Sequence, residues 1–180
     1  MSKKPHVIII MGVTGVGKIE IGEELAEELG WVFYNGADFH PQANIDKMNE
    51  GIPLTDEDRQ PWLETLNKLI HKHIQQGQHA VLACSALKQS YRDALLAGND
   101  GSVFVYLKGS PTLIGARLRQ RLGQLMKANL IDSQYEALEE PDGVLTIDAD
   151  DPPRAIIKQI IKEFSLNRHN DSSPFPPETV

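Results

Sequence analysis

The sequence predicts a single three-layer α/β domain built on a parallel sheet. Short apolar runs alternate with amphipathic segments along residues 7–164, and strands that alternate with helices form parallel sheets. Polar and charged side chains follow the ends of several of these runs, which is where open α/β sheets bind their ligands. With 180 residues and 41% apolar content, the chain is large enough for one well-buried domain but small for two.

The chain is organised around its first strand, loop and helix. Residues 7–11 are apolar, residues 12–18 read Gly-Val-Thr-Gly-Val-Gly-Lys, and residues 19–29 place Ile21, Leu25 and Leu29 on one helical face. This arrangement is typical of a phosphate-binding P-loop, in which backbone N–H groups surround a phosphate and a lysine reaches the β- and γ-phosphates. The fold is therefore predicted to be of the P-loop nucleoside-triphosphate kinase type. The expected nucleotide-binding residues are Gly12, Val13, Thr14, Gly15, Val16, Gly17, Lys18 and Ile19.

The residue after the loop lysine departs from the complete motif. That position normally holds Ser or Thr, because the hydroxyl is a ligand of Mg²⁺. Ile19 occupies it here and cannot bind a metal, so we predict no metal ligand at this position. The next residue, Glu20, suits the helix dipole but lies close to where the triphosphate charge must enter.

The second strand and the segment after it carry the next polar groups. Residues 31–34 are expected to form a buried strand, and the loop over residues 35–41 contains Asp38 and His40. A helix is expected over residues 42–50. Thr55, with Asp58 three residues later, is a helix start signal, although Pro61 predicts that regular helix begins only near Gln60 and continues to Gly77. His71 and His73 do not share a face of that helix, and we expect both to be solvated.

The third unit repeats the pattern of a strand with polar groups at its end. Residues 80–84 form the strand, Ser-Ala-Leu-Lys follows at 85–88, and a helix with Tyr91, Arg92 and Asp93 ends at Gly98. Cys84 is expected to be a small buried residue, and a single cysteine fits a reducing compartment.

The last part of the domain is predicted to contain two more strands and two more helices. Residues 103–107 and 144–147 are the strands, and Ser110 with Pro111 caps a helix that carries Arg117, Arg119 and Arg121. A final helix is expected over residues 153–164. Residues 165–180 show no periodicity, which predicts a disordered tail after a domain that spans residues 1–164.

Composition excludes several classes of partner. The net charge of −7 argues against nucleic acid and anionic membranes. The chain has no apolar stretch long enough to span a membrane, and the apolar run at residues 7–11 is too short for a signal-peptide core. We therefore expect a cytoplasmic protein.

Four stretches in a fixed order point to one family. They are the glycine loop, Asp38-Phe39-His40-Pro41, residues 51–63 (Gly-Ile-Pro-Leu-Thr-Asp-Glu-Asp-Arg-Gln-Pro-Trp-Leu), and residues 84–93 with Cys-Ser-Ala-Leu-Lys and Tyr-Arg-Asp. Together they resemble the P-loop gluconokinases, small shikimate-kinase-like enzymes that transfer the γ-phosphoryl group of ATP to the 6-hydroxyl of D-gluconate. The resemblance covers about residues 7–162 and implies a sugar-acid substrate, ATP and Mg²⁺. Because members of the family are commonly dimers, it also implies a homodimer.

The resemblance also assigns roles to individual residues. Lys18 binds the β- and γ-phosphates, and Asp38 is either a site carboxylate or a loop-capping residue. Arg117 and Arg121 belong to a lid at about residues 117–135 that closes over ATP, or else form an exposed basic helix face. These four are the expected catalytic residues. The expected ligands of the sugar acid or the transferred phosphate are His40, Arg59, Lys88 and Arg92. Lys88 and Arg92 lie one helical turn apart and form either an anion pocket or, for Arg92, a salt bridge with Asp93 or a glutamate.

The departures from the family pattern fall at the site. The family has Asp-Ala-Asp or Asp-Gly-Asp after the second strand, whereas this chain has Asn35-Gly36-Ala37, which lacks the candidate base for the attacking hydroxyl. The family's lid motif, Gly-His-Phe-Met, is Gly123-Gln124-Leu125-Met126 here. Together with Ile19, these changes predict a gluconokinase-like enzyme of impaired activity. The alternative is an inactive relative that binds a nucleotide, a sugar acid or a protein partner, and a kinase of another small molecule is least favoured.

Overall fold

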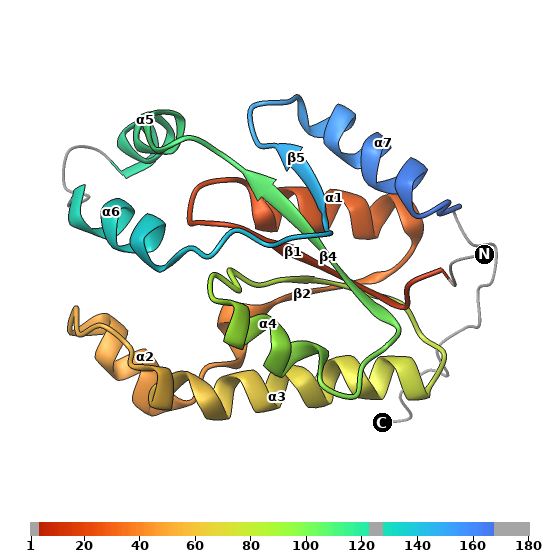
Figure 1. Cartoon of the computed structure of the whole chain (residues 1–180), viewed down its shortest axis with the longest axis horizontal. Helices are drawn as coiled ribbons and strands as arrows, with labels where there is room; N and C mark the ends of the chain where they lie inside the picture. The colour runs from red at the N-terminus through yellow and green to blue at the C-terminus, as the bar shows by residue number, and fades with distance from the viewer. Residues whose placement is uncertain (1–3, 123–127, 168–180) are drawn as a thin grey trace, which may run out of the picture.

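A five-stranded parallel sheet with helices on both faces forms the centre of the protein (Figure 1). A computed structural model describes residues 4–122 and 128–167. The strands lie in the order β2-β3-β1-β4-β5, and every neighbouring pair is parallel. This arrangement confirms the predicted three-layer α/β fold. The strands are β1 (Val7–Met11), β2 (Val32–Asn35), β3 (Ala80–Ala83), β4 (Ser102–Lys108) and β5 (Leu145–Asp148).

The helices divide between the two faces of the sheet. Helices α1 (Lys18–Leu29) and α7 (Pro153–Glu163) pack on one face, and α3 (Asp56–Gln75) and α4 (Gln89–Leu96) pack on the other. The remaining elements are the short 3₁₀ helix η1 (Gly36–Phe39) and α2 (Gln42–Asn49), which come after β2, and α5 (Pro111–Leu122) and α6 (Ala128–Ala137), which lie between β4 and β5 in the chain. The sequence did not predict α6. None of the helices in the described part is long and apolar enough to cross a membrane.

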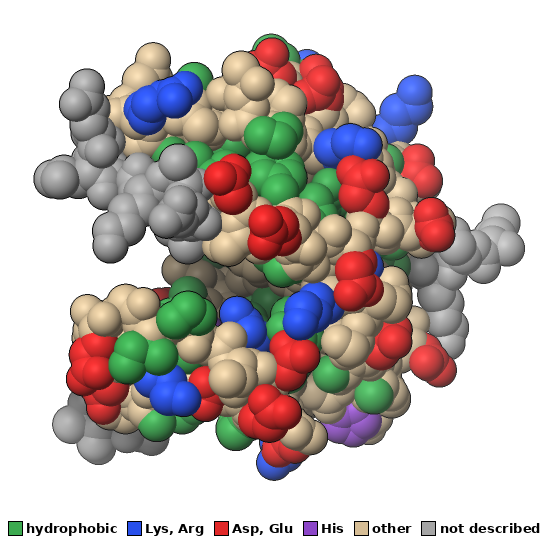
Figure 2. All heavy atoms as spheres, turned by 60° about the vertical axis from the view of Figure 1, so that its left-hand side comes forward, with side chains coloured by type: hydrophobic (Ala, Val, Ile, Leu, Met, Phe, Trp, Pro, Cys, Tyr) green, Lys and Arg blue, Asp and Glu red, His purple; other side chains and the backbone are tan. Residues whose placement is uncertain are grey.

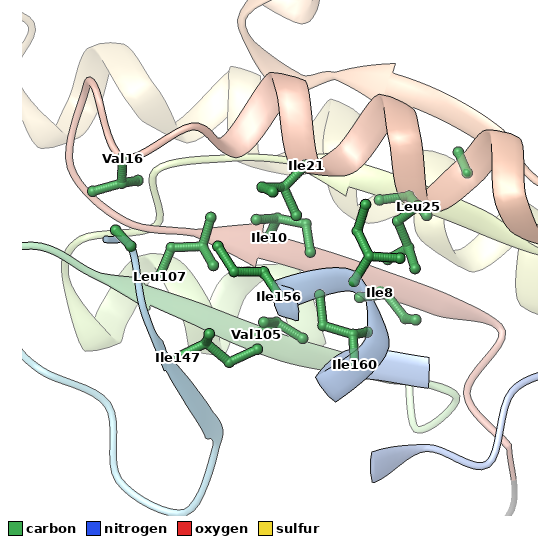
Figure 3. Packing of buried hydrophobic residues seen from close by; sticks show 14 of the residues in the cluster. Ile8, Ile10, Val16, Ile21, Leu25, Val105, Leu107, Ile147, Ile156 and Ile160 are labelled. Carbon is green, nitrogen blue, oxygen red and sulfur yellow. The ribbon is translucent and has the colours of Figure 1, made fainter. Parts of the chain in front are cut away.

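The central strand β1 is buried on both sides, which explains its unbroken apolar sequence. Ile8 and Ile10 contact the cluster under α1 and α7, where Ile21, Leu25 and Ile156 also pack (Figure 3). The alternate residues of the strand face the second cluster under α3 and α4. This double burial fixes the glycine loop, which begins directly after β1.

Two predictions from the sequence, the burial of β2 and the start of α3, were wrong. Strand β2 is only half-buried, because it is an edge strand of the sheet. Helix α3 begins at Asp56 and not near Gln60. Thr55 and Asp58 form a capping box at its start, and this box holds the first turn in place although Pro61 lies in the second.

Burial also differs from the prediction at His73 and after α7. His73 is 6% exposed, and its Nε2 lies 3.0 Å from the Tyr34 hydroxyl, so it is not solvated. Ser165 ends α7 in a left-handed conformation, and the Leu166 N–H bonds to the Ile161 carbonyl. Leu166 is thereby buried in the core, so the expected tail does not begin at Ser165. Residues 168–180 lie outside the described part.

Candidate active site

The glycine loop connects β1 to α1 and has the backbone of a phosphate-binding loop. Gly12 has a φ of 146°, and a Cβ there would lie 2.7 Å from the Leu107 carbonyl oxygen, so only glycine fits. The Gly12 N–H donates to the Ser85 carbonyl, which ties the loop to the end of β3. Gly17 precedes the first helical residue with a φ of 98°. The loop therefore presents the N-terminus of α1 to the cavity beside it, as an anion site requires.

Lys18 is the charged group of the loop. Its Nζ donates to the carbonyl oxygens of Gly12 at 2.9 Å and Val13 at 3.0 Å. Burial lowers the pKa of Lys18 to about 8, so the ammonium is still mostly protonated at neutral pH. Burial also raises the pKa of the nearby Cys84 to about 12, which keeps this thiol neutral. The cysteine is buried as predicted.

A cavity of about 590 Å³ opens beside the loop and joins several of the predicted residues. Its lining comes from the glycine loop, α1, the ends of β2 and β3, and the start of α3. Figure 2 shows a deep hollow on this side of the molecule, with Lys and Arg side chains on its lower rim. The lining that matters here is Thr14, Lys18, Ile19, Ala37, His40 and Trp62. Asp38 is not part of this lining, although Ala37 directly before it is.

The chemistry of this lining does not fit a protein-bound Mg²⁺. Ile19 is 46% exposed at the position where the motif places a hydroxyl ligand, and Ala37 has no oxygen in its side chain. Within the described residues, no group of three or more His, Cys, Asp and Glu side chains could hold a metal ion. Three glutamates of α1, Glu20, Glu23 and Glu24, line the outer part of the same cavity and make it more acidic.

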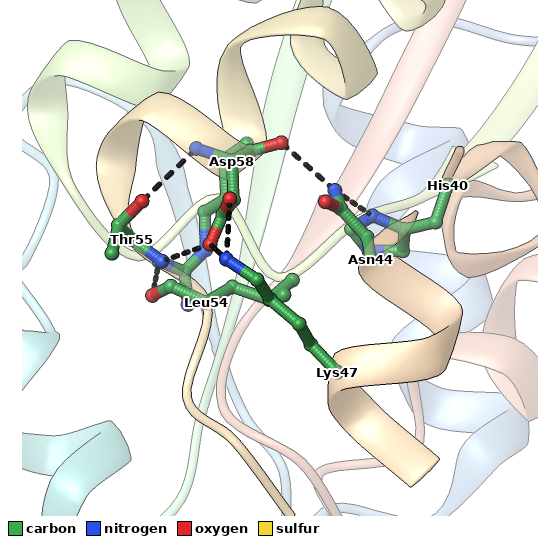
Figure 4. Close-up of polar contacts among 7 residues, drawn as sticks. His40, Asn44, Lys47, Leu54, Thr55 and Asp58 are labelled. Atoms are coloured by element: carbon green, nitrogen blue, oxygen red, sulfur yellow. Dashed lines mark hydrogen bonds and ion pairs between the residues drawn. The ribbon is translucent and has the colours of Figure 1, made fainter. Parts of the chain in front are cut away.

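His40 lines this cavity and is held in a defined orientation (Figure 4). Its ring stacks on Trp62 with centroids 4.3 Å apart, and its Nδ1 lies 3.2 Å from Asn44 Nδ2. Since an amide nitrogen only donates, Nδ1 accepts and the neutral ring carries its proton on Nε2. Burial, and secondarily the charge of Arg59, lower the pKa of His40. The imidazole is thus a neutral hydrogen-bond donor at physiological pH.

The start of α3 is held to α2 by a second polar cluster (Figure 4). Asp58 accepts hydrogen bonds from Lys47 Nζ at 2.8 and 2.9 Å and from the Thr55 N–H at 2.9 Å. The Lys47 bond, followed by the Thr55 bond, holds the pKa of Asp58 below its usual value. Asn44 donates to the Asp58 carbonyl at 2.8 Å. Asp58 is therefore a structural carboxylate in this geometry.

Arg59 and Lys88 meet around the ring of Tyr91. The Arg59 guanidinium carbon lies 5.5 Å and the Lys88 Nζ 5.6 Å from the ring centroid. Asp56 accepts from the Tyr91 hydroxyl and from Lys88 at 3.1 Å, and these two bonds hold its pKa below the usual value. No role for Asp56 or Tyr91 is evident from the sequence, because their contact depends on the docking of α3 against α4.

Arg92 is buried, and its hydrogen bonds go to groups within the protein. Its guanidinium donates to the carbonyls of Ala86, Leu87 and Glu139 and to the Gln89 side chain, and the residue is 2% exposed. Lys88, for its part, bonds to Asp56. In this structure Arg92 holds the segment after β3, where Ala86 adopts a φ of 45°.

A second cavity, of about 380 Å³, lies on the other side of the glycine loop. Its lining includes Gly15, Gly17 and Arg117 together with residues of the segment between β5 and α7. Arg117 donates to the Ala149 carbonyl at 2.7 Å and lies 3.9 Å from Asp150. The side chain of Arg121, and the whole of Gln124, lie outside the described residues. The proposed lid is therefore described only on its two flanks, α5 and α6.

Helix α6 brings a residue to the loop that sequence analysis missed. The Gln134 side chain bonds to the Thr14 N–H at 2.6 Å and to the Thr14 hydroxyl at 2.7 Å. Next to it, the Tyr135 hydroxyl donates to the Gly109 carbonyl at 2.6 Å. No local pattern links Gln134 to a loop so far away in the sequence.

Comparison with known proteins agrees with this geometry. The family model for shikimate kinase matches residues 14–164. A probable gluconokinase of Xenopus tropicalis is 42% identical over 172 residues, which cover 86% of this chain and 90% of that protein. The thermoresistant gluconokinase of Escherichia coli is 38% identical, over 87% of this chain and 92% of its own length.

Solved structures point the same way. A gluconokinase from Sinorhizobium meliloti superposes with a TM-score of 0.81 at 38% identity, covering 91% of this chain and 94% of its own. Shikimate kinase from Aquifex aeolicus shares the fold, with a TM-score of 0.57 at 16% identity over 88% of this chain and 96% of that one. The chain belongs to the gluconokinase family of shikimate-kinase-like P-loop kinases.

Proposed function

We propose that this protein is an ATP-dependent kinase of D-gluconate with low turnover, which forms 6-phosphogluconate in the cytoplasm. The observation that carries the proposal is the shared cavity of about 590 Å³, in which Lys18 of the phosphate loop and His40 of the substrate side line the same space. The gluconokinases at 38–42% identity along most of the chain support the substrate.

In the proposed complex the two sides of the cavity bind different molecules. The phosphate-loop side binds the nucleotide, and the substrate side, formed by α2, α3 and α4, binds the sugar acid. The loop N–H groups and Lys18 hold the β- and γ-phosphates, and Arg117 flanks the nucleotide on the side of the second cavity, with Arg121 further along the same helix. Neutral His40 donates a hydrogen bond to the polyhydroxy acid, whose carboxylate pairs with Arg59 or Lys88. Arg92 contributes by fixing the segment that carries Lys88. Asp38 remains a candidate site carboxylate, next to Ala37 but outside the lining of the cavity.

The low turnover follows from what the cavity lacks. ATP is used together with Mg²⁺, but Ile19 supplies no ligand to the metal, and loss of supporting metal contacts costs about 10- to 100-fold. Ala37 cannot act as a general base, which costs about another 10²- to 10⁴-fold. The three glutamates on α1 further disfavour a triphosphate.

The same three features favour a second candidate, a catalytically inactive relative. Such a protein would keep the fold to bind a nucleotide, a sugar acid or a protein partner without turnover. A homodimer is compatible with both candidates and stays a prediction.

Two measurements on the same sample separate the candidates. ATP consumption is measured with D-gluconate and Mg²⁺, and ATP is titrated into the protein by calorimetry. Turnover that disappears in Lys18→Met establishes the kinase, because that control excludes a contaminating enzyme. ATP binding without turnover establishes the inactive relative.

A double variant tests the explanation for low turnover. Ile19→Thr combined with Ala37→Asp restores a hydroxyl and a carboxylate, so turnover is expected to rise by at least about 100-fold. An unchanged rate would show that neither position limits the reaction.

A further inference from the structure

The hydrogen bonds between Gln134 and Thr14 have only one consistent assignment. A backbone N–H can only donate, so the amide atom that faces the Thr14 nitrogen at 2.6 Å must be the oxygen, Oε1. The other amide atom is then Nε2, which can only donate, and it lies 2.7 Å from Thr14 Oγ1. The Thr14 hydroxyl therefore accepts a hydrogen bond from Gln134 and keeps its own proton for another acceptor.

The surroundings of Thr14 indicate where that proton can go. Thr14 lines the cavity that also contains Lys18, His40 and Trp62, which is the substrate side of the loop. The cavity beside Arg117, on the proposed nucleotide side, is not lined by Thr14, whereas Gly15 and Gly17 border both cavities. In the proposed complex the phosphate nearest the sugar acid is the terminal phosphate of the triphosphate. Because Thr14 lines the cavity on the sugar-acid side, we expect this phosphate to be the one that reaches Thr14.

Contacts of two neighbouring residues hold helix α6 in place around Gln134. The hydroxyl of the adjacent Tyr135 donates to the Gly109 carbonyl at 2.6 Å. Ile131, one turn earlier on the helix, packs against the buried core cluster that contains Ile114 and Leu118. Because its helix is fixed by these contacts, the Gln134 amide can set the rotamer of Thr14.

We propose that Gln134 is a positioning residue, which orients the Thr14 hydroxyl as a hydrogen-bond donor to the terminal phosphate of a bound nucleoside triphosphate. The inference rests on the proposed nucleotide binding and extends it to a residue outside the glycine motif. A hydrogen bond to a charged group is worth about a 10- to 100-fold change in affinity. The effect is specific to the terminal phosphate, so ATP depends on Gln134 and ADP does not.

The test is calorimetric titration of ATP and ADP into the full chain and four variants. Gln134→Met and Thr14→Val are each expected to weaken ATP binding by about 10- to 100-fold and ADP binding by less than about threefold. The double variant is expected to match the single ones, because both changes remove the same donor. Thr14→Ser keeps the hydroxyl and is expected to bind ATP like the unchanged protein.

Two further variants guard against a purely structural effect. Gln134→Glu keeps an acceptor for the Thr14 N–H, but its second oxygen only accepts, so the Thr14 hydroxyl turns away from the phosphate and ATP binding weakens again. This variant carries the test if Gln134→Met does not fold. Gln75→Met, an exposed position near the end of α3, is the matched control and should bind both nucleotides normally.

The outcomes separate the inference from the proposed function. Equal loss of ATP and ADP affinity, or full ATP affinity in Gln134→Met, would overturn the role of Gln134 while leaving nucleotide binding intact. If the unchanged protein binds neither nucleotide, the proposed function fails and this inference fails with it.

Discussion

The two sides of the main cavity, the substrate side and the phosphate-loop side, balance their charges in different ways. On the side formed by α2, α3 and α4, two lysines are paired with carboxylates, Lys47 with Asp58 and Lys88 with Asp56. On the phosphate-loop side, Lys18 donates to two neutral carbonyls. The comparison indicates that the charged side chains of the substrate side are preorganised by their partners, whereas the charge of Lys18 is balanced only when an anion binds.

The largest expected effect, and the strongest test of this difference, comes from removing the charge of Lys18. Lys18→Met should lower ATP affinity and any turnover by at least about 100-fold, because a preorganised cation at the phosphates is lost. Its thermal stability at pH 7 should not fall, since the buried ammonium is a cost to the folded state, as its lowered pKa indicates. Calorimetry and thermal denaturation measure the two effects. A marked loss of stability would show that Lys18 is part of the packed framework.

For Arg92, the buried cation behind the substrate side, we expect the substitution to lower stability. Arg92→Met should lower the free energy of unfolding by about 2–4 kcal/mol, because carbonyls of Ala86, Leu87 and Glu139 lose their donor. Arg154→Met is the matched control: its partner Glu28 is also on the surface, so the loss should stay below about 0.5 kcal/mol. Denaturant titration compares the two variants, and similar values would contradict the structural role of Arg92.

A smaller effect is expected where α3 begins. Thr55→Ala removes the side-chain half of the capping box and should cost about 1 kcal/mol of stability. Thr65→Ala, in the middle of the same helix, should be neutral or slightly stabilising, because alanine has the higher helix propensity. If Thr55→Ala were also neutral, the start of α3 at Asp56 would depend on tertiary contacts and not on its cap.

The smallest expected effect is a pH dependence that belongs only to the loop. Because the pKa of Lys18 is about 8, ATP affinity should fall roughly fourfold from pH 7 to pH 8.5 and binding should take up protons above pH 8. Between pH 8 and the ordinary lysine pKa near 10.5, the unfolded chain binds more protons, so this group makes stability rise with pH. Titrations in two buffers of different ionisation enthalpy measure the uptake, and Lys18→Met should abolish it.

The sequence was informative at most places where local chemistry decides the structure; the start of α3 is an exception, because the prediction gave Pro61 more weight than the capping box. The glycine loop, the apolar runs and the cap at Ser110 each depend on neighbouring residues, and the structure contains all of them. Predictions failed where packing decides. The burial of His73 requires Tyr34 from β2, and the half-burial of β2 follows from its place at the edge of the sheet. Gln134 could not have been found, because no local pattern encodes its contact with Thr14.

The strand order also has a consequence for how the protein is made. β1 comes before the other four described strands in the chain, yet its hydrogen-bonding partners begin at Ala80 and Ser102. At a synthesis rate of about 5–20 residues per second, the uncharged run Val-Ile-Ile-Ile-Met stays unpaired for seconds. Such a segment is prone to self-association until it is covered. Yield in the cell should therefore depend on chaperones that bind nascent chains, even though the finished strand is inaccessible to them.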